Sequence, residues 1–187
     1  MSSSRDPDQG LKLLKAGNER FIAGNMEYSR FTQANREATL FGQSPFAIIV
    51  ACSDSRVPPD LIFDQGIGQL FIVRVAGNVV SAVEQDSINY AVLVLKASLI
   101  VVLGHESCGA VTAVVQNNAQ EIPTLGAWIK KGISPEATIE QAVKQNVHHG
   151  IETIQCAPLL EKLLEEKKLK IVGGYYFLKE GRVEFFE

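Results

Sequence analysis

Runs of apolar, β-branched residues alternate with amphipathic stretches along most of the chain. Residues 46–51, 69–76 and 99–103 are continuous apolar runs of the kind that form buried strands in a parallel sheet. Helical patterns lie before, between and after these runs, at 32–41, 60–63, 83–96, 109–116, 136–156 and 158–168. Strands that alternate with helices predict an α/β fold, with a central, mostly parallel sheet flanked by helices and joined by right-handed crossovers.

The N-terminal region predicts a tail followed by a helical arm. Residues 1–9 are polar, and we expect them to form a frayed, flexible tail. From Gly10 a helical pattern begins, and it stops near Gly24. The arm presents one apolar face, made of Leu11, Leu14, Phe21 and Ile22.

The C-terminal region predicts an antiparallel hairpin at the edge of the sheet. Residues 169–178 and 182–186 are strand-like and flank the turn-like sequence Lys-Glu-Gly at 179–181. Before it, residues 117–135 contain Pro123 and Pro135 and are predicted to be loose. We expect Trp128, within this stretch, to have an interface or packing role rather than a substrate role. Since no internal repeat or linker is visible, we expect 1–187 to be one domain.

Composition excludes several function classes. The 187 residues carry 18 basic and 21 acidic side chains, so the net charge is −3 and nucleic-acid binding is not expected. The most apolar stretch, 90–103, is interrupted by Lys96 and Ser98 and is too short to span a bilayer. The first residues lack the apolar core of a signal peptide. Three cysteines are an odd number and favour reduced thiols over a disulfide framework, so we expect a soluble, cytoplasmic protein.

Three metal-ligating residue types lie at or just beyond the ends of predicted strands. Cys52 follows the first strand, His105 follows the third, and Cys108 comes three residues later at a helix start. The carboxyl ends of parallel strands are where such sheets bind ligands. Two thiolates and one imidazole suit Zn²⁺ and leave a fourth coordination position open. On composition alone, the alternative of two small buried cysteines and a capping histidine stays open.

A carboxylate and a guanidinium follow the first of these cysteines. In an extended segment, Cys52, Asp54 and Arg56 share one face. An adjacent arginine keeps the pKa of a carboxyl low, so that it remains a hydrogen-bond acceptor beside a metal. The alternative is an ordinary ion pair in a surface loop.

The paired motifs Ala-Cys-Ser-Asp-Ser-Arg-Val (51–57) and Gly-His-Glu-Ser-Cys-Gly-Ala (104–110) resemble the signature of the β-class carbonic anhydrases. The similarity extends to 17–21, 60–64, 70–74, 76–78 and 171–176, and so covers most of the chain. It implies zinc-dependent, reversible hydration of CO₂ to bicarbonate and a proton through zinc-bound hydroxide.

The resemblance also implies a role for each matching residue. One zinc ion per subunit would be held by Cys52, His105 and Cys108, with Asp54 and Arg56 as an orienting pair. The positions implied for substrate binding are Gln43, Phe71, Ala76, Tyr90 and Gly109. In this family the position of Gln43 reaches into a neighbouring subunit, and the N-terminal helix packs across it. We therefore expect a homodimer or a dimer of dimers.

The fourth zinc position depends on Asp54. Some members of the family close the site by moving this aspartate onto the metal, and a bicarbonate pocket built from Trp, Arg and Tyr accompanies that regulation. Here Arg74 and Tyr176 match two of the pocket positions, but the third is Ile49, which has no indole N–H. We expect Asp54 to stay paired with Arg56 at mildly alkaline pH and to act as a fourth ligand only in a closed state.

Two other functions remain open at this point. The same superfamily contains carbon disulfide and carbonyl sulfide hydrolases, and a member without turnover would be a zinc scaffold or bicarbonate-sensing module. His148 and His149 face different directions on a helix, so we expect surface or interface roles for them. Cys156 has no partner at ligand spacing and is predicted to be a buried thiol.

Overall fold

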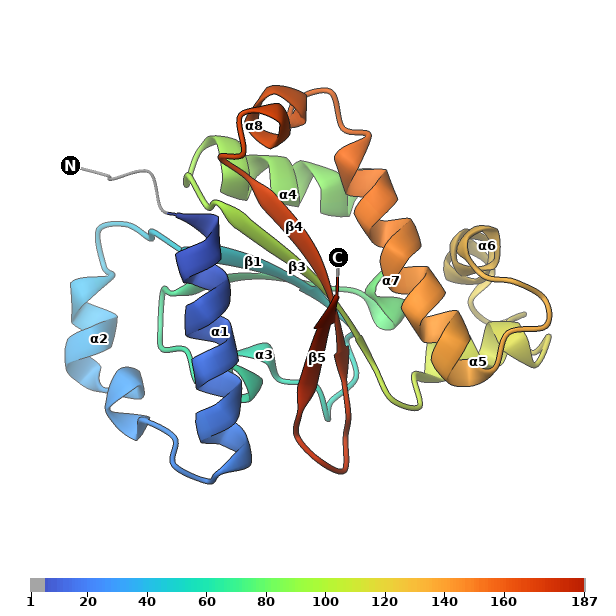
Figure 1. The fold of residues 1–187 in the computed structure, drawn as a ribbon, viewed down its shortest axis with the longest axis horizontal. Coiled ribbons are helices and arrows are strands. Elements are labelled where there is room, and N and C mark those ends of the chain that lie inside the picture. The colour runs from blue at the N-terminus through green and yellow to red at the C-terminus, as the bar shows by residue number, and fades with distance from the viewer. Residues whose placement is uncertain (1–5, 187) are drawn as a thin grey trace.

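A five-stranded sheet forms the centre of the protein (Figure 1). The structure, a computed structural model, describes residues 6–186, without the side chains of residues 28 and 29. The strand order is β2-β1-β3-β4-β5, with the first four parallel and the last antiparallel to β4. The strands are β1 (Ala47–Ala51), β2 (Leu70–Arg74), β3 (Leu99–His105), β4 (Lys170–Tyr176) and β5 (Val183–Phe186). This confirms the predicted α/β fold class, including the C-terminal edge hairpin.

Helices surround this sheet and fill most of the remaining chain. They are α1 (Pro7–Ile22), α2 (Gln33–Ala38), α3 (Pro59–Ile62), α4 (Ala82–Leu93), α5 (Gly109–Val115), α6 (Pro123–Gly132), α7 (Ile139–Gln155) and α8 (Glu161–Glu165). Two 3₁₀ turns add to them, η1 (Tyr28–Phe31) and η2 (Ala76–Asn78). None of the helices in the described part of the chain is long and apolar enough to cross a membrane.

Both faces of the central strands are covered, which explains why β1 and β3 are apolar without alternation. Side chains of β1 on one face, such as Ile49, pack in a cluster with Leu14 of α1 and Ile62 of α3. The other face, which includes Ile48, packs with α4 and α7. In Figure 1, α7 runs beside the sheet and α5 and α6 gather near one of its ends. A third cluster, under α5, α6 and α7, contains the two cysteines of the candidate site.

Three helices differ clearly from the sequence predictions, and one of them, α8, spans only Glu161–Glu165 where 158–168 was predicted. Helix α1 begins at Pro7 rather than Gly10, because Asp6 accepts a hydrogen bond from the Asp8 amide and Pro7 suits a first helical position. Residues 7–9, predicted to be tail, are therefore helical, and residues 1–5 of that tail lie outside the described range. Helix α6 occupies most of the stretch predicted to be loose. It starts at Pro123, whose missing N–H costs nothing in a first turn.

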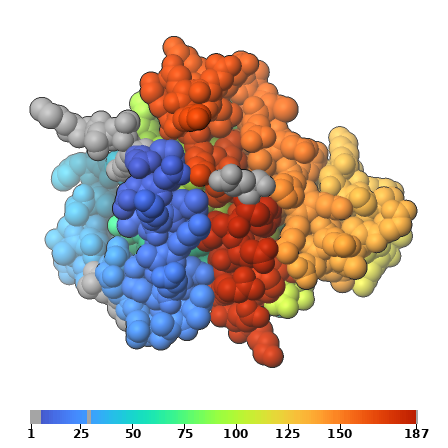
Figure 2. All heavy atoms as spheres, viewed as in Figure 1, coloured from blue at the N-terminus to red at the C-terminus, as the bar shows by residue number. Residues whose placement is uncertain are grey.

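Most of the apolar face of α1 lies on the chain's own core, while Ile22 is exposed. Leu14 is fully buried, and Leu11 and Phe21 pack on the same cluster. The Asn18 amide donates to the Gly181 carbonyl at 2.8 Å and accepts from the Val183 N–H at 2.8 Å. These bonds tie α1 to the C-terminal hairpin, and Figure 2 shows the two segments side by side. Leu14 is therefore committed to the chain's own core, whereas Ile22 is 48% exposed, and the packing of this helix across a partner stays a prediction.

Candidate metal centre

Three ligand side chains meet at the carboxyl ends of β1 and β3. Because β1 and β3 are in parallel register, Ala51 lies opposite Leu103, and the residues that follow each strand become neighbours. Cys52 comes directly after β1, His105 ends β3, and Cys108 caps the N-terminus of α5. Their ligand atoms lie within 4.8 Å of one another, and all three residues are buried. The cluster could hold a metal ion.

His105 has one ring nitrogen engaged and one that needs a partner. Nδ1 is 2.9 Å from the Glu106 carbonyl oxygen, an acceptor that holds the proton on Nδ1. Nε2 is buried and has no hydrogen-bond partner among the described residues. One unprotonated imidazole nitrogen without a hydrogen-bond partner and two cysteine sulfurs form a donor set that zinc prefers. The residues present therefore fit such a metal.

The two thiols of the cluster differ in acidity because they share a contact. The hydrogen bond from Cys108, together with a weaker one from the Gly77 amide, lowers the pKa of Cys52. The Gly77 N–H lies 3.3 Å from Cys52 Sγ. The same contact, with burial, raises the pKa of Cys108. A metal cation bound by both sulfurs would displace their protons.

Asp54 lies at the edge of the cluster and is held by Arg56. Oδ1 accepts from the Arg56 backbone amide and from Nε, both at 2.9 Å, and Oδ2 accepts from Nη2 at 2.8 Å. These bonds lower the pKa of the Asp54 carboxyl. Asp54 Oδ2 is 3.9 Å from His105 Nε2, so the ionised carboxylate faces the open side of the ligand set.

Arg74, at the end of β2, fixes the backbone of the loop that carries Cys52 and Asp54. Its Nε donates to the Cys52 carbonyl at 3.0 Å and its Nη2 to the Asp54 carbonyl at 2.7 Å. The family resemblance matched Arg74 and Tyr176 to two positions of a bicarbonate pocket whose third position, Ile49, cannot supply the required donor. In the structure Ile49 is fully buried in the core and Tyr176 is almost so.

The five predicted substrate positions separate into two groups. Ala76 precedes Gly77 in η2, and Gly109 follows Cys108, so both adjoin the cluster. Gln43 precedes β1, whereas the cluster follows it, so the length of the strand separates them.

The other two positions, Phe71 and Tyr90, lie beside the first half of β1. Phe71 pairs with Ile48 near the start of β1, and its ring is 6.3 Å from that of Tyr90. Within one chain, the structure does not bring these side chains to the cluster.

The remaining singled-out side chains lie elsewhere. His148 and His149 contact different rings, those of Phe186 at 5.1 Å and Trp128 at 4.3 Å. Cys156 is exposed, so the prediction of a buried thiol is wrong. It caps the C-terminus of α7, where the chain leaves the core.

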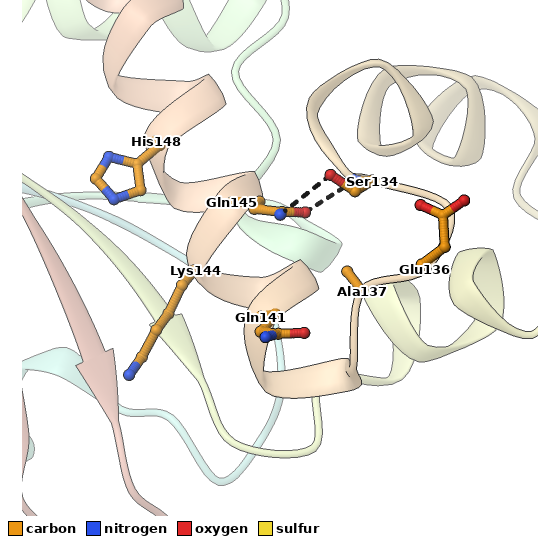
Figure 3. A pocket seen from close by; sticks show the side chains of 7 residues that line it. All are labelled: Ser134, Glu136, Ala137, Gln141, Lys144, Gln145 and His148. Atoms are coloured by element: carbon orange, nitrogen blue, oxygen red, sulfur yellow. Dashed lines mark hydrogen bonds between the residues drawn. The ribbon is translucent and has the colours of Figure 1, made fainter.

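A surface hollow of about 380 Å³ beside α7 contains none of the three ligand residues (Figure 3). It is lined by Ser134, Glu136, Ala137, Gln141, Lys144, Gln145 and His148. Its only hydrogen bonds drawn in Figure 3 join Gln145 to Ser134, at 2.8 and 3.2 Å. It is separate from the candidate metal centre.

Two residues near the cluster escaped the sequence analysis. Gly77 entered only as part of the family similarity at 76–78, without a role, yet its amide contacts Cys52. Asn146 donates from α7 to the Gly77 carbonyl at 2.8 Å. One signal could have found it, since Asn146 interrupts the apolar face formed by Val143, Val147 and their neighbours.

Comparison with known proteins agrees with this geometry. The sequence profile of the carbonic anhydrase family matches residues 47–183. The chain belongs to the β-carbonic anhydrase family. Carbonic anhydrase 2 of Mycobacterium tuberculosis is 36% identical over 191 residues, which cover 95% of this chain and 91% of that protein. The resemblance drawn from the two motifs is confirmed.

Solved β-carbonic anhydrases share the fold. The β-carbonic anhydrase CcaA is 29% identical, with a TM-score of 0.75 and 95% of each chain covered. One of two tetrameric β-carbonic anhydrases of Sordaria macrospora superposes with a TM-score of 0.65 at 23% identity, covering 96% of this chain and 97% of that one. The Cys-His-Cys cluster is consistent with the zinc-dependent hydration of CO₂ that this family performs.

Proposed function

We propose that this chain hydrates CO₂ reversibly to bicarbonate and a proton, using one zinc ion held by Cys52, His105 and Cys108. The observation that carries the proposal is the unpartnered, buried Nε2 of His105 beside two sulfurs and the ionised Asp54. A structural zinc site usually has four protein ligands, and the described part of the chain offers three here.

The protein residues around the cluster account for the rest of the chemistry. Zinc bound there would supply a Lewis acid that makes water nucleophilic near neutral pH. Asp54 would accept a hydrogen bond from the attacking water and so direct an oxygen lone pair toward CO₂. Arg56 keeps Asp54 ionised and oriented through its two side-chain bonds. Ala76 and Gly109 present little bulk and no polar side chain, which suits a small apolar substrate.

Removing a ligand tests this function directly. Cys52→Ala should lose both zinc and CO₂ hydration, measured by metal analysis and by stopped-flow detection of the released proton. Cys156→Ala is the matched control, because that cysteine is exposed at the end of α7. Retention of full activity in Cys52→Ala would contradict the proposal.

Assays of turnover also distinguish the two alternative functions. Release of sulfide from carbon disulfide or carbonyl sulfide faster than CO₂ hydration would identify a heterocumulene hydrolase. Zinc-loaded protein without any turnover would identify a scaffold or bicarbonate-sensing module. The Asp54–Arg56 pair beside three ligands favours turnover, since a purely structural metal has no need of such an acceptor.

We also infer a homodimer or dimer of dimers in which Gln43, Phe71 and Tyr90 serve the site of a partner subunit. All three lie toward the opposite end of β1 from this chain's cluster, as described above. Two apolar side chains just before Gln43 support an interface there, since Leu40 is 69% and Phe41 fully exposed. The relatives with the same fold from Sordaria macrospora are tetrameric.

A mixed dimer tests the shared site. Gln43→Ala and Cys52→Ala should each abolish or strongly reduce activity as homodimers. A dimer with one subunit of each kind contains one site with both changes and one site with neither. It should recover about half of the wild-type activity per dimer, whereas mixed dimers as inactive as the parents would refute sharing. We further expect a cytoplasmic location, where the three free cysteines stay reduced.

A further inference from the structure

A buried amide connects helix α7 to the candidate metal centre. Asn146 is fully buried on α7, and its Nδ2 donates to the Gly77 carbonyl at 2.8 Å. Gly77 in turn donates its N–H to Cys52 Sγ at 3.3 Å. We propose that Asn146 is a positioning residue for the Cys52 sulfur, acting through Gly77. This inference rests on the proposed function, because it concerns the same metal centre.

Gly77 needs an external restraint because of its conformation. Its φ is +72° and its ψ is 19°, a left-handed conformation that glycine enters and leaves without steric cost. A side chain could not lock it, since a Cβ at this position would lie 2.9 Å from Ile129 Cδ1 and 3.3 Å from Ala110 Cβ. The bond from Asn146 holds the carbonyl side of the residue, and its amide side is then directed at the sulfur.

Close packing on β3 fixes the position of α7, and therefore also the position of the Asn146 side-chain amide relative to Gly77. Gly104 of β3 has no side chain, so Val143 and Val147, which lie near Asn146 on α7, can pack directly against the strand backbone. Gly150 does the same on the helix side, where a Cβ would lie 3.2 Å from Val102 Cγ1. The helix therefore packs directly against the strand that ends in His105.

An amide in this apolar environment has a cost that a packing role does not explain. Asn146 lies among Ala142, Val143 and Val147, all fully buried, and its Oδ1 has no hydrogen-bond partner among the described residues. A buried unpaired carbonyl is destabilising, and an aliphatic side chain would avoid it. The hydrogen bond to the Gly77 carbonyl is the favourable interaction that offsets this cost.

The test compares Asn146→Ala with Gln145→Ala, a change on the adjacent position of the same helix. Among the described residues, Gln145 bonds the loop residue Ser134 (Figure 3), and neither residue belongs to the cluster. Zinc affinity is measured by competition with a chromophoric chelator, and the thiolate-to-cobalt charge-transfer band is recorded on protein loaded with Co²⁺. We expect Asn146→Ala to weaken zinc binding about tenfold and to shift the band to lower energy, because outer-shell partners of ligands have effects of this order. Gln145→Ala should match the wild type in both.

The outcomes separate this inference from the proposed function. If Asn146→Ala lowers the unfolding midpoint but leaves zinc affinity and the cobalt band at wild-type values, its role is structural and the inference is wrong. If the variant does not fold, the wild type loaded with ¹¹³Cd decides, since the hydrogen bond predicts scalar coupling between the Gly77 amide proton and the metal. Absence of that coupling would overturn the inference. A wild-type chain that takes up neither zinc nor cobalt would overturn the proposed function, and the inference with it.

Discussion

Replacing Gly104 with alanine probes the contact that positions both helix α7 and the metal centre. A Cβ on Gly104 would lie 2.7 Å from Val143 Cγ1 and 2.8 Å from Val147 Cγ2. Both valines are fully buried and β-branched, so they have few alternative rotamers. The added methyl must therefore be accommodated by moving α7 away from β3.

The size of the effect follows from these distances. An ordinary contact begins near 3.4 Å, so α7 must retreat by about 0.7 Å. Overpacking of a buried contact costs about 1–3 kcal/mol of unfolding free energy. For a chain of this size, that lowers the melting temperature by about 2–12 °C. The same movement stretches the 2.8 Å bond from Asn146 to Gly77 to about 3.5 Å, so zinc affinity should fall as well.

Thermal unfolding of the zinc-loaded protein and chelator competition measure the two effects. Gly42→Ala is the matched control, because a Cβ there would meet nothing within 4 Å. It should leave both quantities unchanged or raise stability slightly through the unfolded state. Equal melting temperatures and zinc affinities for the two variants would refute the close packing of α7 on β3.

Three further predictions concern the site and its loop. Arg56→Lys should keep its bound zinc and its melting temperature but lose about 10–100-fold in kcat. The reason is that lysine cannot bond both Asp54 oxygens as the guanidinium does, and an unchanged kcat would contradict it. Removing zinc with a chelator should lower the melting temperature, and adding zinc back should restore it, because the ligands converge only in the folded chain. A melting temperature that does not change with zinc would argue against the site. Burial raises the pKa of the Asp60 carboxyl, so its ionisation opposes folding above the unfolded pKa of about 3.9. In urea unfolding, Asp60→Asn should therefore increase stability at pH 7, with a gain that disappears as the pH falls below that value; a gain independent of pH would show that the carboxyl's ionisation is not its cause.

The strands and the metal ligands could be predicted from the sequence because each rests on local patterns. An apolar, β-branched run such as 99–103 has few other ways to bury its side chains, and it forms β3. Parallel strands bring their carboxyl ends to one edge, so Cys52 and His105 had to become neighbours once the strands were placed. Asp54 and Arg56 are two residues apart, and their pairing needs no distant part of the chain.

Helix boundaries depended on capping that the hydrophobic pattern does not contain. The Asp6 cap starts α1 three residues before the pattern begins. Pro123 suggested a break, but at the first turn of α6 it is compatible with a helix. The exposure of Cys156 also depends on where α7 ends, which the apolar periodicity places only approximately.

Only the tertiary structure showed how the site is supported and where its pocket residues lie. Asn146 and Gly77 are 69 positions apart, and no local pattern relates them; their contact exists because α7 packs against β3 at Gly104. Gln43 and Cys52 are close in sequence, yet the extended strand β1 carries them to opposite ends of the sheet. Sequence motifs thus predicted which side chains form the candidate site, since ligand type and strand pattern are local properties. The packing of helices on the sheet decided which groups orient those side chains, because such contacts arise only when distant segments are brought together.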